Sequence, residues 1–596
     1  MKILYITCML LATTAILHAN NISVSNVTLT GQNTSAGANN AANFSLVKFN
    51  LSWENSWRIS TGSTNWDAAW IFVKFRVGAS DPTFTGVSSS GTTVTVNSTT
   101  NLRVGMPVRV TAGTGAFAAN TFISSITNAT QFVVTAAPST PLSGASIECI
   151  RIWEHARLNN TGHTAPSGST IDAGLLTPGS AFNATTNPAV GVFMYRNANG
   201  SGTNTFNNTQ LRWNYGANGI NDNMMVSVQV FAIEMVFVPG AVDFTVGDGV
   251  STSSFTQTTI TTATANIAGG FPTGQTAPTN ASWPNGYNSF YCMKYEISQG
   301  QYRDFLNTLT RTQQANRVTM DGTVGRYAGG FTWNGAVWTS GEVNNLTTPA
   351  NRIGLRLIAD PGGVSPRTYA CDLNPSGSLP SGVNQSDDGE CIAMGQLSWM
   401  DGCAYMDWAG LRPMTELEYE KACRGNQAPV SNEYAWGNAT TTSANNITNS
   451  GQAGEVTNTA NANSASANQT NVQGPLRVGA FAGAATTRAQ AGATYYGIME
   501  MSGNQWERAV TIGDATGRNY TGTHGDGSLS TNGHANSTAW PGISSEEVTG
   551  ATGSGFRGGV WSFGLSHMRV SDRTNAANTL TSRDSDRGFR GIRVSP

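Results

Sequence analysis

Alternation of apolar and polar residues is the feature that most restricts the fold of the first part of this chain. Segment 47–53 alternates along its whole length, and segments 70–77 and 224–230 show the same period less strictly. A period of two places the apolar side chains on one face of a β-strand. No long stretch with the helical period of 3.6 occurs between residues 20 and 231. This region is therefore predicted to be an all-β sandwich.

A second, smaller β-unit is predicted inside the sandwich, at residues 80–148. Its short β-rich runs, separated by Gly and Asn turns, are residues 92–96, 107–110 and 131–134. The flanking segments 71–77 and 150–153 have the pattern of two partner strands of one hairpin. A hairpin tip tolerates insertion well because few contacts cross it. We therefore expect a sandwich of residues 20–79 and 149–233, interrupted by a small inserted β-domain.

The N-terminus has the pattern of a secretion signal. Lys2 precedes an apolar run at residues 3–17, which is too short to span a bilayer. A signal peptide at residues 1–19, with cleavage after Ala19, is the expected outcome. No second apolar run approaches membrane length. We therefore expect a protein that is secreted or associated with the cell surface, without a membrane span.

The low charge of the chain narrows its possible partners. Only 11% of the 596 residues are charged, and the net charge is −2. Nucleic-acid binding needs a clustered excess of Lys and Arg, so no nucleic-acid partner is expected. A sparsely charged surface also resists self-association less well than a charged one. Self-assembly therefore stays open as a function.

The chain changes character after residue 233, where helix signals begin. Ser298, Ser398 and Thr415 can each cap a helix, and Thr415 forms a capping box with Glu418. The first of these helices is predicted to bury one face made of Tyr302, Phe305, Leu306 and Leu309. The C-terminal part is therefore predicted to be α+β.

Apart from Cys8, the chain has six cysteines, Cys149, Cys292, Cys371, Cys391, Cys403 and Cys423. An even count in an oxidising compartment permits three disulfides. Cys371 with Cys391 is the pair we expect first. The alternative is a set of buried thiols, because free cysteine is among the most buried residue types.

The segment between Cys371 and Cys391 also has oxygen-bearing residues at alternating positions. Asp372, Asn374 and Ser376 are followed by Gly377, as in the first half of an EF-hand loop. A calcium-ordered loop and a solvated polar loop both fit this pattern.

Five sequence blocks in the C-terminal part occur in an order that resembles one enzyme family. The blocks are Met235 to Gly240, Phe290 to Leu306, Ser398 to Glu420, Gly497 to Glu507 and Gly555 to Arg590. Together they resemble the formylglycine-generating enzyme (sulfatase-modifying factor) family over residues 234–596. The resemblance implies a C-type-lectin-like fold, with two main helices, short twisted sheets and long loops.

The residues that such enzymes use for catalysis are missing here. Active members carry a cysteine pair near the C-terminus that binds copper, but this chain has no cysteine after Cys423. A thiolate is the copper ligand and redox centre, so neither copper nor catalysis is expected. Trp561, Phe563 and His567 occupy the place where the family binds its substrate. They are the predicted ligand-binding residues, and local core packing is the alternative.

The resemblance also implies two calcium sites. One would be formed by Glu500 and Glu507 together with the backbone carbonyls of Gly503 and Gln505. The alternative is that Glu507 only satisfies buried N–H groups. The other site would begin at Asn446-Ile447, although its later aspartate is not evident.

The disulfides of active relatives do not carry over to this chain. One would join positions near Met406 and Gly591, and another would join Cys423 to a position near Val570. The partner cysteines are missing in both cases. A rearranged pairing, such as Cys403 with Cys423, is the remaining option that this resemblance leaves.

Three functions compete on these grounds. The first is a secreted or cell-surface protein that uses its lectin-like domain for adhesion or for binding an unknown extracellular ligand or receptor. The second is a homo-oligomeric structural subunit of an extracellular filament or surface layer, since edge strands favour association. The third, a divergent sulfatase-modifying enzyme, is disfavoured by the missing cysteines.

Overall fold

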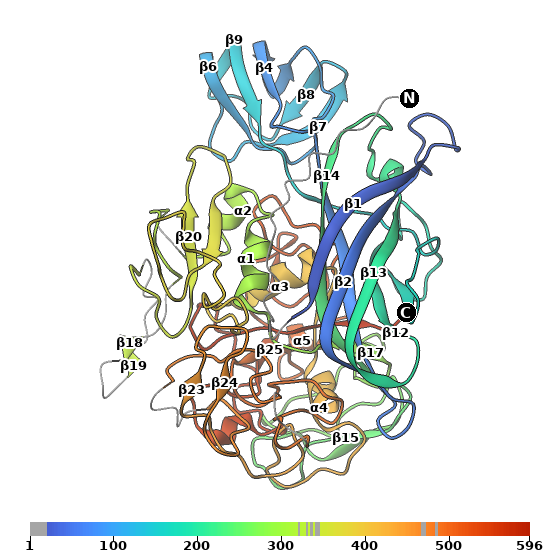
Figure 1. The fold of residues 1–596 in the computed structure, drawn as a ribbon, viewed down its shortest axis with the longest axis vertical. Coiled ribbons are helices and arrows are strands. Elements are labelled where there is room, and N and C mark those ends of the chain that lie inside the picture. Colours follow the sequence, from blue (N-terminus) through green and yellow to red (C-terminus); the bar gives the residue numbers. More distant parts are fainter. Residues whose placement is uncertain are drawn as a thin grey trace.

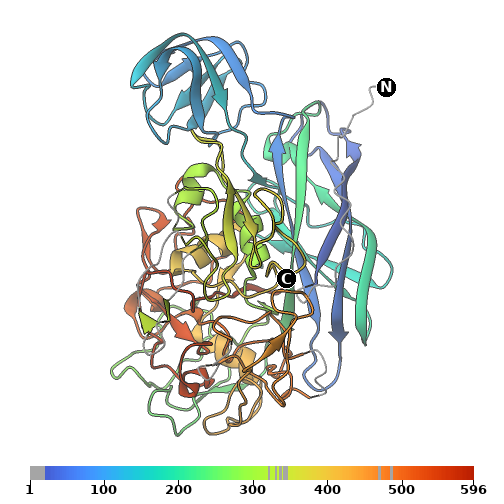
Figure 2. The same ribbon diagram turned by 60° about the vertical axis from the view of Figure 1, so that its left-hand side comes forward.

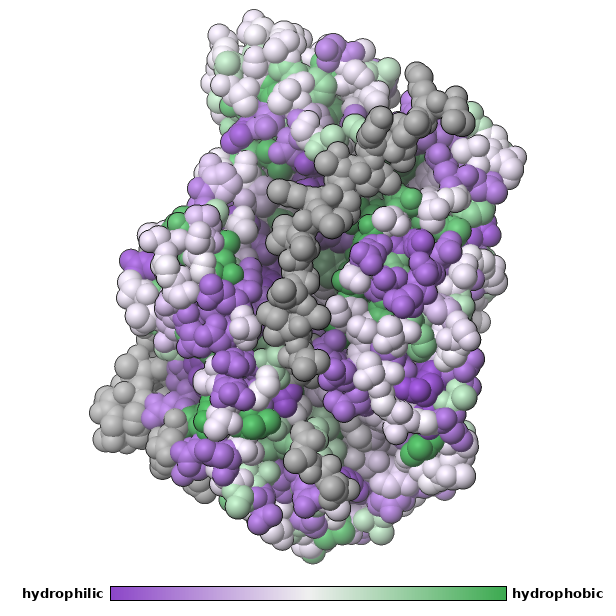
Figure 3. All heavy atoms as spheres, in the orientation of Figure 1, coloured by the Kyte–Doolittle hydropathy of each residue, from purple (hydrophilic) through white to green (hydrophobic). Residues whose placement is uncertain are grey.

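The computed structural model describes residues 21–319, 322–328, 332–333, 338–339, 346–466, 472–482 and 487–596. It is built mainly from β-strands, with few and short helices (Figure 1). A β-sandwich lies along one side, an irregular C-terminal part lies beside it, and a small β-unit sits at one end (Figure 2). On the face drawn in Figure 3, apolar residues form small separate groups among polar and weakly polar ones.

The sandwich consists of two sheets around one apolar core. The first sheet has the order β1 (Ser23–Asn33), β2 (Phe44–Arg58) and β13 (Gly200–Trp213). The alternating residues of β2, Val47, Phe49, Leu51 and Trp53, are at most 1% exposed and pack in this core. The period-two prediction for this segment is confirmed.

The second sheet extends beyond the sandwich into the C-terminal part. Its strand order is β11 (Ser169–Leu175), β12 (Ala189–Arg196), β3 (Asp67–Val77), β14 (Val226–Val238), β17 (Phe290–Met293), β29 (Gly591–Val594) and β22 (Arg412–Pro413). β10 (Glu154–His155) pairs with β3 off this path. One continuous sheet therefore connects the two halves of the chain.

Strand β3 is buried on both faces because each face packs in a different core. Ile71 and Val73 point into the sandwich core, whereas Trp70 and Phe72 join the core of the C-terminal part. The indole Nε1 of Trp70 donates a hydrogen bond to the carbonyl of Ala409 at 2.8 Å. The sandwich is thus one wall of the C-terminal core.

Strand β14 runs across the expected boundary at residues 233 and 234 without a break. Its first residues pair with β3, and Met235–Val238 pair with β17. Near this point the strand gains β17 as a second neighbour while it still pairs with β3 through Val236. The division of the chain into domains stays a prediction.

Six strands at the end of the molecule pair with one another in the order β6 (Val108–Ala116), β9 (Thr140–Cys149), β4 (Thr83–Ser90), β5 (Thr93–Thr95), β8 (Gln131–Val134) and β7 (Ile123–Asn128). This unit, called the six-stranded unit below, has its own apolar core. The expected partner strand at residues 150–153 is wrong. Those residues form no strand, and Glu154 and His155 pair with β3 instead.

The C-terminal part contains helices α1 (Gln299–Leu306), α2 (Arg311–Ala315), α3 (Trp399–Trp408), α4 (Glu416–Arg424) and α5 (Ala515–Arg518). Ser298, Ser398 and Thr415 cap α1, α3 and α4, as predicted. Each cap is a capping box, which was predicted for Thr415 alone. The predicted apolar face, Tyr302, Phe305, Leu306 and Leu309, is at most 4% exposed. The short helices α2 and α5 were not expected.

The remaining strands form two-stranded pieces that support long loops, namely β15 (Phe244–Val246) with β16 (Thr258–Ile260), β18 (Thr332–Trp333) with β19 (Trp338–Thr339), β20 (Leu355–Ala359) with β21 (Thr368–Cys371), β23 (Ile447–Thr448) with β24 (Val456–Thr457), β25 (Glu507–Val510) with β28 (Ser554–Arg557), and β26 (Ile543–Ser544) with β27 (Glu547–Val548). Two short 3₁₀-helices, η1 (Tyr215–Asn218) and η2 (Leu565–Met568), complete the set. Backbone outside regular elements therefore makes up much of this part.

The expected disulfides are corrected by the structure. Cys371, Cys403 and Cys423 are free, buried thiols, so neither the Cys371–Cys391 nor the Cys403–Cys423 bridge is present. Burial in apolar surroundings raises the pKa of the Cys403 and Cys423 thiols, which keeps them protonated and unreactive. The alternative of buried thiols describes these three residues.

The loop after Cys371 is closed by its own side chains. The Asp372 carboxylate pairs with Arg356 and accepts a hydrogen bond from the Tyr327 hydroxyl at 3.1 Å. Asn374 Nδ2 donates to the carbonyl of Asp387 at 2.7 Å, and Ser376 Oγ donates to Gln385 at 2.9 Å. Asn374 and Ser376 are thus used within the loop and Asp372 is paired with residues outside it, while Oδ1 of Asp372 has no hydrogen-bond partner among the described residues. The calcium-ordered loop and the polar loop both stay open.

Candidate functional site

The predicted binding segment follows β28, which pairs with β25 so that Arg557 lies opposite Glu507. Gly558 and Gly559 come next, with φ angles of 86° and 68°. A Cβ atom on Gly559 would lie 2.6 Å from Cγ of Met568. Only glycine permits this close approach in a left-handed conformation. The segment 560–564 is thereby held against η2.

Three aromatic rings meet at the surface of this segment, those of Trp506, Phe563 and His567. The Trp506 ring lies 6.0 Å from Phe563 and 5.8 Å from His567, edge to face in both cases. Phe563 and His567 are 6.0 Å apart at 76°. We call this group the aromatic triangle. Phe563 is 46% exposed, whereas Trp506 is buried beneath it.

Trp561 has a different role from the one predicted. It is only 2% exposed and packs with Val560, Phe556 and Trp506. In this position its side chain serves the core, which was the alternative expected for the segment. The structure therefore brings two of the three predicted ligand-binding residues together at the surface and places the third below them.

Trp506 takes the place of Trp561 in the surface group. It belongs to the Gly-Asn-x-Trp-Glu block that carries the family resemblance, so its sequence signal was visible. No local pattern shows that its ring contacts Phe563 and His567, which lie 57 and 61 positions further along the chain. Such contacts depend on the pairing of β25 with β28.

Buried polar groups lie beneath the same segment. Oγ of Ser562, Oγ of Ser585 and Oδ1 of Asp586 are buried and make no hydrogen bond within the described part of the chain. Burial raises the pKa of Asp586 to about 7, against the opposing effect of the Arg587 guanidinium. Oδ1 of Asp586 lies 3.9 Å from Nε of Arg587. This carboxyl group was not among the predicted site residues.

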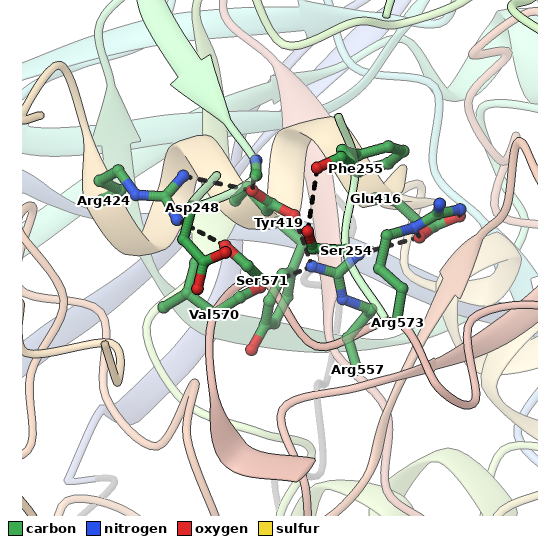
Figure 4. A network of polar contacts seen from close by, with 12 residues as sticks. Asp248, Ser254, Phe255, Glu416, Tyr419, Arg424, Arg557, Val570, Ser571 and Arg573 are labelled. Carbon is green, nitrogen blue, oxygen red and sulfur yellow. Dashed lines mark hydrogen bonds and ion pairs between the residues drawn. The ribbon is translucent and has the colours of Figure 1, made fainter. Parts of the chain in front are cut away.

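A network of buried charges anchors the segment to α4 (Figure 4). Glu416 accepts hydrogen bonds from Arg573 at 2.6 and 2.9 Å and from Arg557 at 2.9 Å. Arg557 also reaches Glu420 at 2.8 Å. Burial alone would raise the pKa of Glu416, but Arg573 and Arg557 hold it below its usual value. These arginines are scaffold groups, as expected for a fold with much irregular backbone.

The residues of the first predicted calcium site lie together in the interior. Oε1 of Glu507 accepts a hydrogen bond from Arg590 at 2.7 Å, and Oε1 of Glu500 accepts one from the N–H of Gly479 at 2.8 Å. The second oxygens of both carboxylates and Oε1 of Gln505 are buried without a hydrogen-bond partner among the described residues. Burial raises the pKa of Glu500 to about 7.

This site is short of positive charge, which fits a bound cation. Glu296 lies near Glu500 and Glu507, and its pKa is raised well above the usual range by burial and by those two neighbours. Arg590 is the charged partner of Glu507 in an ion pair. Within the described residues, no three His, Cys, Asp or Glu side chains are grouped so that they could hold a metal ion. A calcium ion would therefore need the carbonyls of Gly503 and Gln505 as further donors.

The residues of the second predicted calcium site lie in a surface turn. The carbonyl of Asn446 accepts hydrogen bonds from the N–H of Asn458 at 3.2 Å and from the Thr457 hydroxyl at 3.1 Å. Ile447 begins β23, which pairs with β24. These contacts close a surface turn, and calcium binding at this turn stays a prediction.

The positions at which relatives carry disulfides do meet in space. A Cβ atom on Gly591 would lie 1.8 Å from Sδ of Met406, so the methionine fills the space above the glycine. Cys423 and Val570 share one apolar cluster. Apolar packing thus occupies both places where the resemblance implies a cross-link.

Helices in the described part of the chain are all too short or too polar to cross a membrane. A search of curated proteins finds no match to this chain. Among solved structures, one similar chain is Treponema denticola variable protein 1, at 10% identity and a TM-score of 0.26. The alignment covers 61% of this chain and 96% of that one.

The sequence model of one family matches more than half of the chain. It describes the sulfatase-modifying factor enzyme 1-like domain and matches residues 251–595. The match includes the capped helices α3 and α4, the β25–β28 pair and the segment beneath the aromatic triangle. The expected family is therefore confirmed, and the chain belongs to the sulfatase-modifying factor enzyme 1-like family.

Proposed function

We propose that this chain is a non-catalytic, secreted or cell-surface protein that binds an extracellular protein through the aromatic triangle. The observation that carries this proposal is the exposure of Phe563 at 46% beside the buried Val560 and Trp561, on a segment whose backbone is hydrogen-bonded at Trp561 and Phe563. Sequence supports the non-catalytic part, because no cysteine follows Cys423 and copper–thiolate chemistry has no ligand there.

The triangle has the physical properties of a binding anchor. Trp506 and His567 limit the positions of the Phe563 ring, so little rotational freedom remains to be lost on binding. A buried aromatic anchor on a rigid support is the usual centre of a protein interface. His567 adds a polar edge, with Nδ1 lying 3.5 Å from the Asp572 carboxylate.

The test is binding of the labelled full chain to an array of purified extracellular proteins. We expect at least one bound protein, and Phe563→Ala should weaken that interaction about tenfold or more. The matched control is Ile126→Ala, which removes an exposed apolar side chain from the six-stranded unit. Binding that both variants leave within twofold of the wild type would contradict the role of the triangle.

A structural subunit is the second candidate, and strand β1 favours it. β1 is 11 residues long, carries no charged side chain and lies at the edge of the three-stranded sheet. Such an edge can pair with another chain. Two irregularities in its pairing with β2, at Ser25/Thr28 and Thr30/Asn33, oppose this, because bulges protect edges. Light scattering and electron microscopy of the secreted chain separate a monomer from filaments or sheets.

The third candidate, a divergent enzyme, has its own test. A cysteine-containing peptide substrate, incubated with the protein, copper and oxygen, should give no aldehyde product by mass spectrometry.

We also propose that calcium is held by Glu500, Glu507 and the carbonyls of Gly503 and Gln505. The uncompensated carboxylate oxygens support that proposal.

A further inference from the structure

A cavity of about 410 Å³ lies where three parts of the molecule meet. The six-stranded unit contributes Val104 and Phe122, the sandwich contributes residues 152–157, and the C-terminal part contributes residues 308–310 and 526–531. This is the end at which the six-stranded unit stands above α2 (Figure 1). None of the residues of the aromatic triangle lines this cavity, so it is a separate place in the fold.

One negative group faces the cavity with an unused oxygen. The N–H of Asp526 donates to Oδ1 of Asp407 at 3.0 Å, which fixes the backbone at this position. Oδ1 of Asp526 accepts a hydrogen bond from the N–H of Ser528 at 2.7 Å, and Oδ2 has no hydrogen-bond partner in the described part of the chain. Desolvation by the cavity walls raises the pKa of Asp526.

One positive group faces the same cavity with unused donors. Nη1 of Arg157 donates to the carbonyl of Ala217 at 2.7 Å, and the Arg157 N–H is bound to Asn218. Nε and Nη2 of Arg157 donate no hydrogen bond to the residues that the structure describes. The charges of Lys74 and Arg157 both act on Asp526, that of Lys74 more strongly, and both oppose the effect of desolvation on its pKa. Asp526 and Arg157 therefore lie within electrostatic reach of each other.

The other charged residues of the wall are already engaged. Glu154 is paired with Arg103 through two hydrogen bonds of 2.7 and 2.8 Å. Nζ of Lys74 donates to the carbonyls of Trp408 and Gly527 at 2.8 and 2.6 Å. Burial also lowers the pKa of Lys74 to about 7. Lys74 is also a positive neighbour of Asp526. The unused hydrogen-bonding atoms of the wall are therefore Oδ2 of Asp526, Nε and Nη2 of Arg157, and one N–H of Lys74, whose ammonium group has three donors.

The remaining wall has an apolar part beside polar residues such as Thr308, Gln313 and Thr531. Val104 is 56% exposed although it is a large hydrophobic residue, and Phe122, Ile152 and Leu529 lie in the same wall. A concave site that combines apolar side chains with a few convergent polar groups is the usual form of a small-molecule site. The Asp526 carboxylate and the Arg157 guanidinium both have atoms free for a further hydrogen bond. A ligand that carries both a positive and a negative charge can therefore form a charge-assisted hydrogen bond with each of them.

We propose that this cavity binds a free amino acid with an apolar side chain. Its ammonium group would be held by the Asp526 carboxylate and its carboxylate by the Arg157 guanidinium. The side chain would lie against Val104, Phe122 and Leu529. This inference goes beyond the proposed binding of an extracellular protein and does not depend on it.

Isothermal titration of the full chain with L-leucine tests the inference. We expect binding that weakens about tenfold or more for 4-methylpentanoate, which lacks the ammonium group, and for isoamylamine, which lacks the carboxylate. Asp526→Asn and Arg157→Gln should each weaken L-leucine binding to a similar extent. Asp526→Asn can keep the hydrogen bond from Ser528, whereas Arg157→Gln is too short to reach the carbonyl of Ala217, so circular dichroism checks that both variants fold.

Matched controls and contrary outcomes make the test decisive. Glu546→Gln removes an exposed carboxylate elsewhere and should leave leucine binding unchanged. Val104→Trp should reduce binding by filling the cavity without touching either charge. The inference is overturned if none of the twenty free amino acids binds, if the two charge variants bind leucine like the wild type, or if glucose binds in preference to leucine.

Discussion

The sandwich and the C-terminal part of this chain fill their interiors with different chemistry. The largest fully buried side chains of the sandwich core are tryptophans, Trp53 and Trp213. In the C-terminal part the largest include six arginines, Arg317, Arg412, Arg424, Arg508, Arg557 and Arg573. Both parts share one sheet, so the difference does not come from separate environments. It comes from the backbone that each interior must accommodate.

Regular strands satisfy their own N–H and C=O groups, whereas irregular loops leave carbonyls that need donors. Arg590 shows how this need is met, because it donates to the carbonyls of Met293 and Met499 as well as to Glu507. Arg557 likewise reaches the carbonyl of Val570. The guanidinium group has five donors, so one side chain can serve several loops. The family scaffold thus depends on ion pairs where the sandwich depends on apolar packing.

The largest effect is expected from breaking the ion-pair network. Glu416→Gln leaves Arg573 and Arg557 buried with one partner charge removed. Loss of one partner from a buried ion pair costs about 3–5 kcal/mol. Denaturant unfolding of the full chain measures this cost, and Glu546→Gln, at an exposed carboxylate, is the control. A loss below about 1 kcal/mol would show that the network is not what holds the loops.

A somewhat smaller effect is expected from a cavity in the sandwich. Leu51→Ala removes a side chain that is 1% exposed, which costs about 2–5 kcal/mol. The control is Ser52→Ala on the outward face of the same strand. Since β14 pairs with both β3 and β17, we expect faster hydrogen exchange at Phe290–Met293 as well as in the sandwich. Faster exchange in the sandwich alone would mean that the two parts unfold independently.

Local signals in the sequence predicted the regular elements of both regions. The alternation at residues 47–53 identified β2, and Ser298, Ser398 and Thr415 marked three helix starts. Each of these signals lies within a few residues of the element that it predicts. The family blocks placed the binding segment in the chain for the same reason.

Features that depend on distant pairing were not predictable. The aromatic character of Trp561 and Phe563 gave no indication of which ring faces inward, because this depends on the packing against Trp506. The continuation of β14 into the C-terminal sheet likewise depends on β17, more than fifty residues later. The sequence did not mark Asp586 as a site residue, because its burial and the lack of a hydrogen-bond partner for its Oδ1 among the described residues depend on the tertiary structure.

A moderate effect is expected from the buried carboxylates that lack positive charge. Burial raises the pKa of Glu500 to about 7 from 4.5. Its contribution to stability is therefore complete below pH 4.5 and is lost as the pH rises to about 7. Calcium should restore that stability above pH 7, by about 2.7 kcal/mol at one hundred times its Kd. Thermal unfolding with calcium and with chelator measures the gain.

Glu500→Gln is the variant that tests this interpretation. It removes the titrating group, so the decrease in stability between pH 4.5 and 7 should become smaller. It also removes a proposed ligand, so calcium should no longer raise the unfolding temperature. If calcium stabilises the variant as much as the wild type, the ion binds elsewhere. If calcium stabilises neither protein, the Arg590–Glu507 pair is sufficient to hold this site.

The smallest effect on stability is expected from the residue with the largest proposed effect on binding. Phe563→Ala removes an exposed ring that contacts only the edges of Trp506 and His567, so unfolding should change by about 0.5 kcal/mol or less. Trp561→Ala, two residues earlier in the same segment, should cost about 3–5 kcal/mol because that ring is buried. Unfolding and binding are measured on both variants. A binding residue should lose affinity with little loss of stability, whereas a core residue should lose stability. Similar losses of stability would place Phe563 in the core and leave the segment without a binding surface.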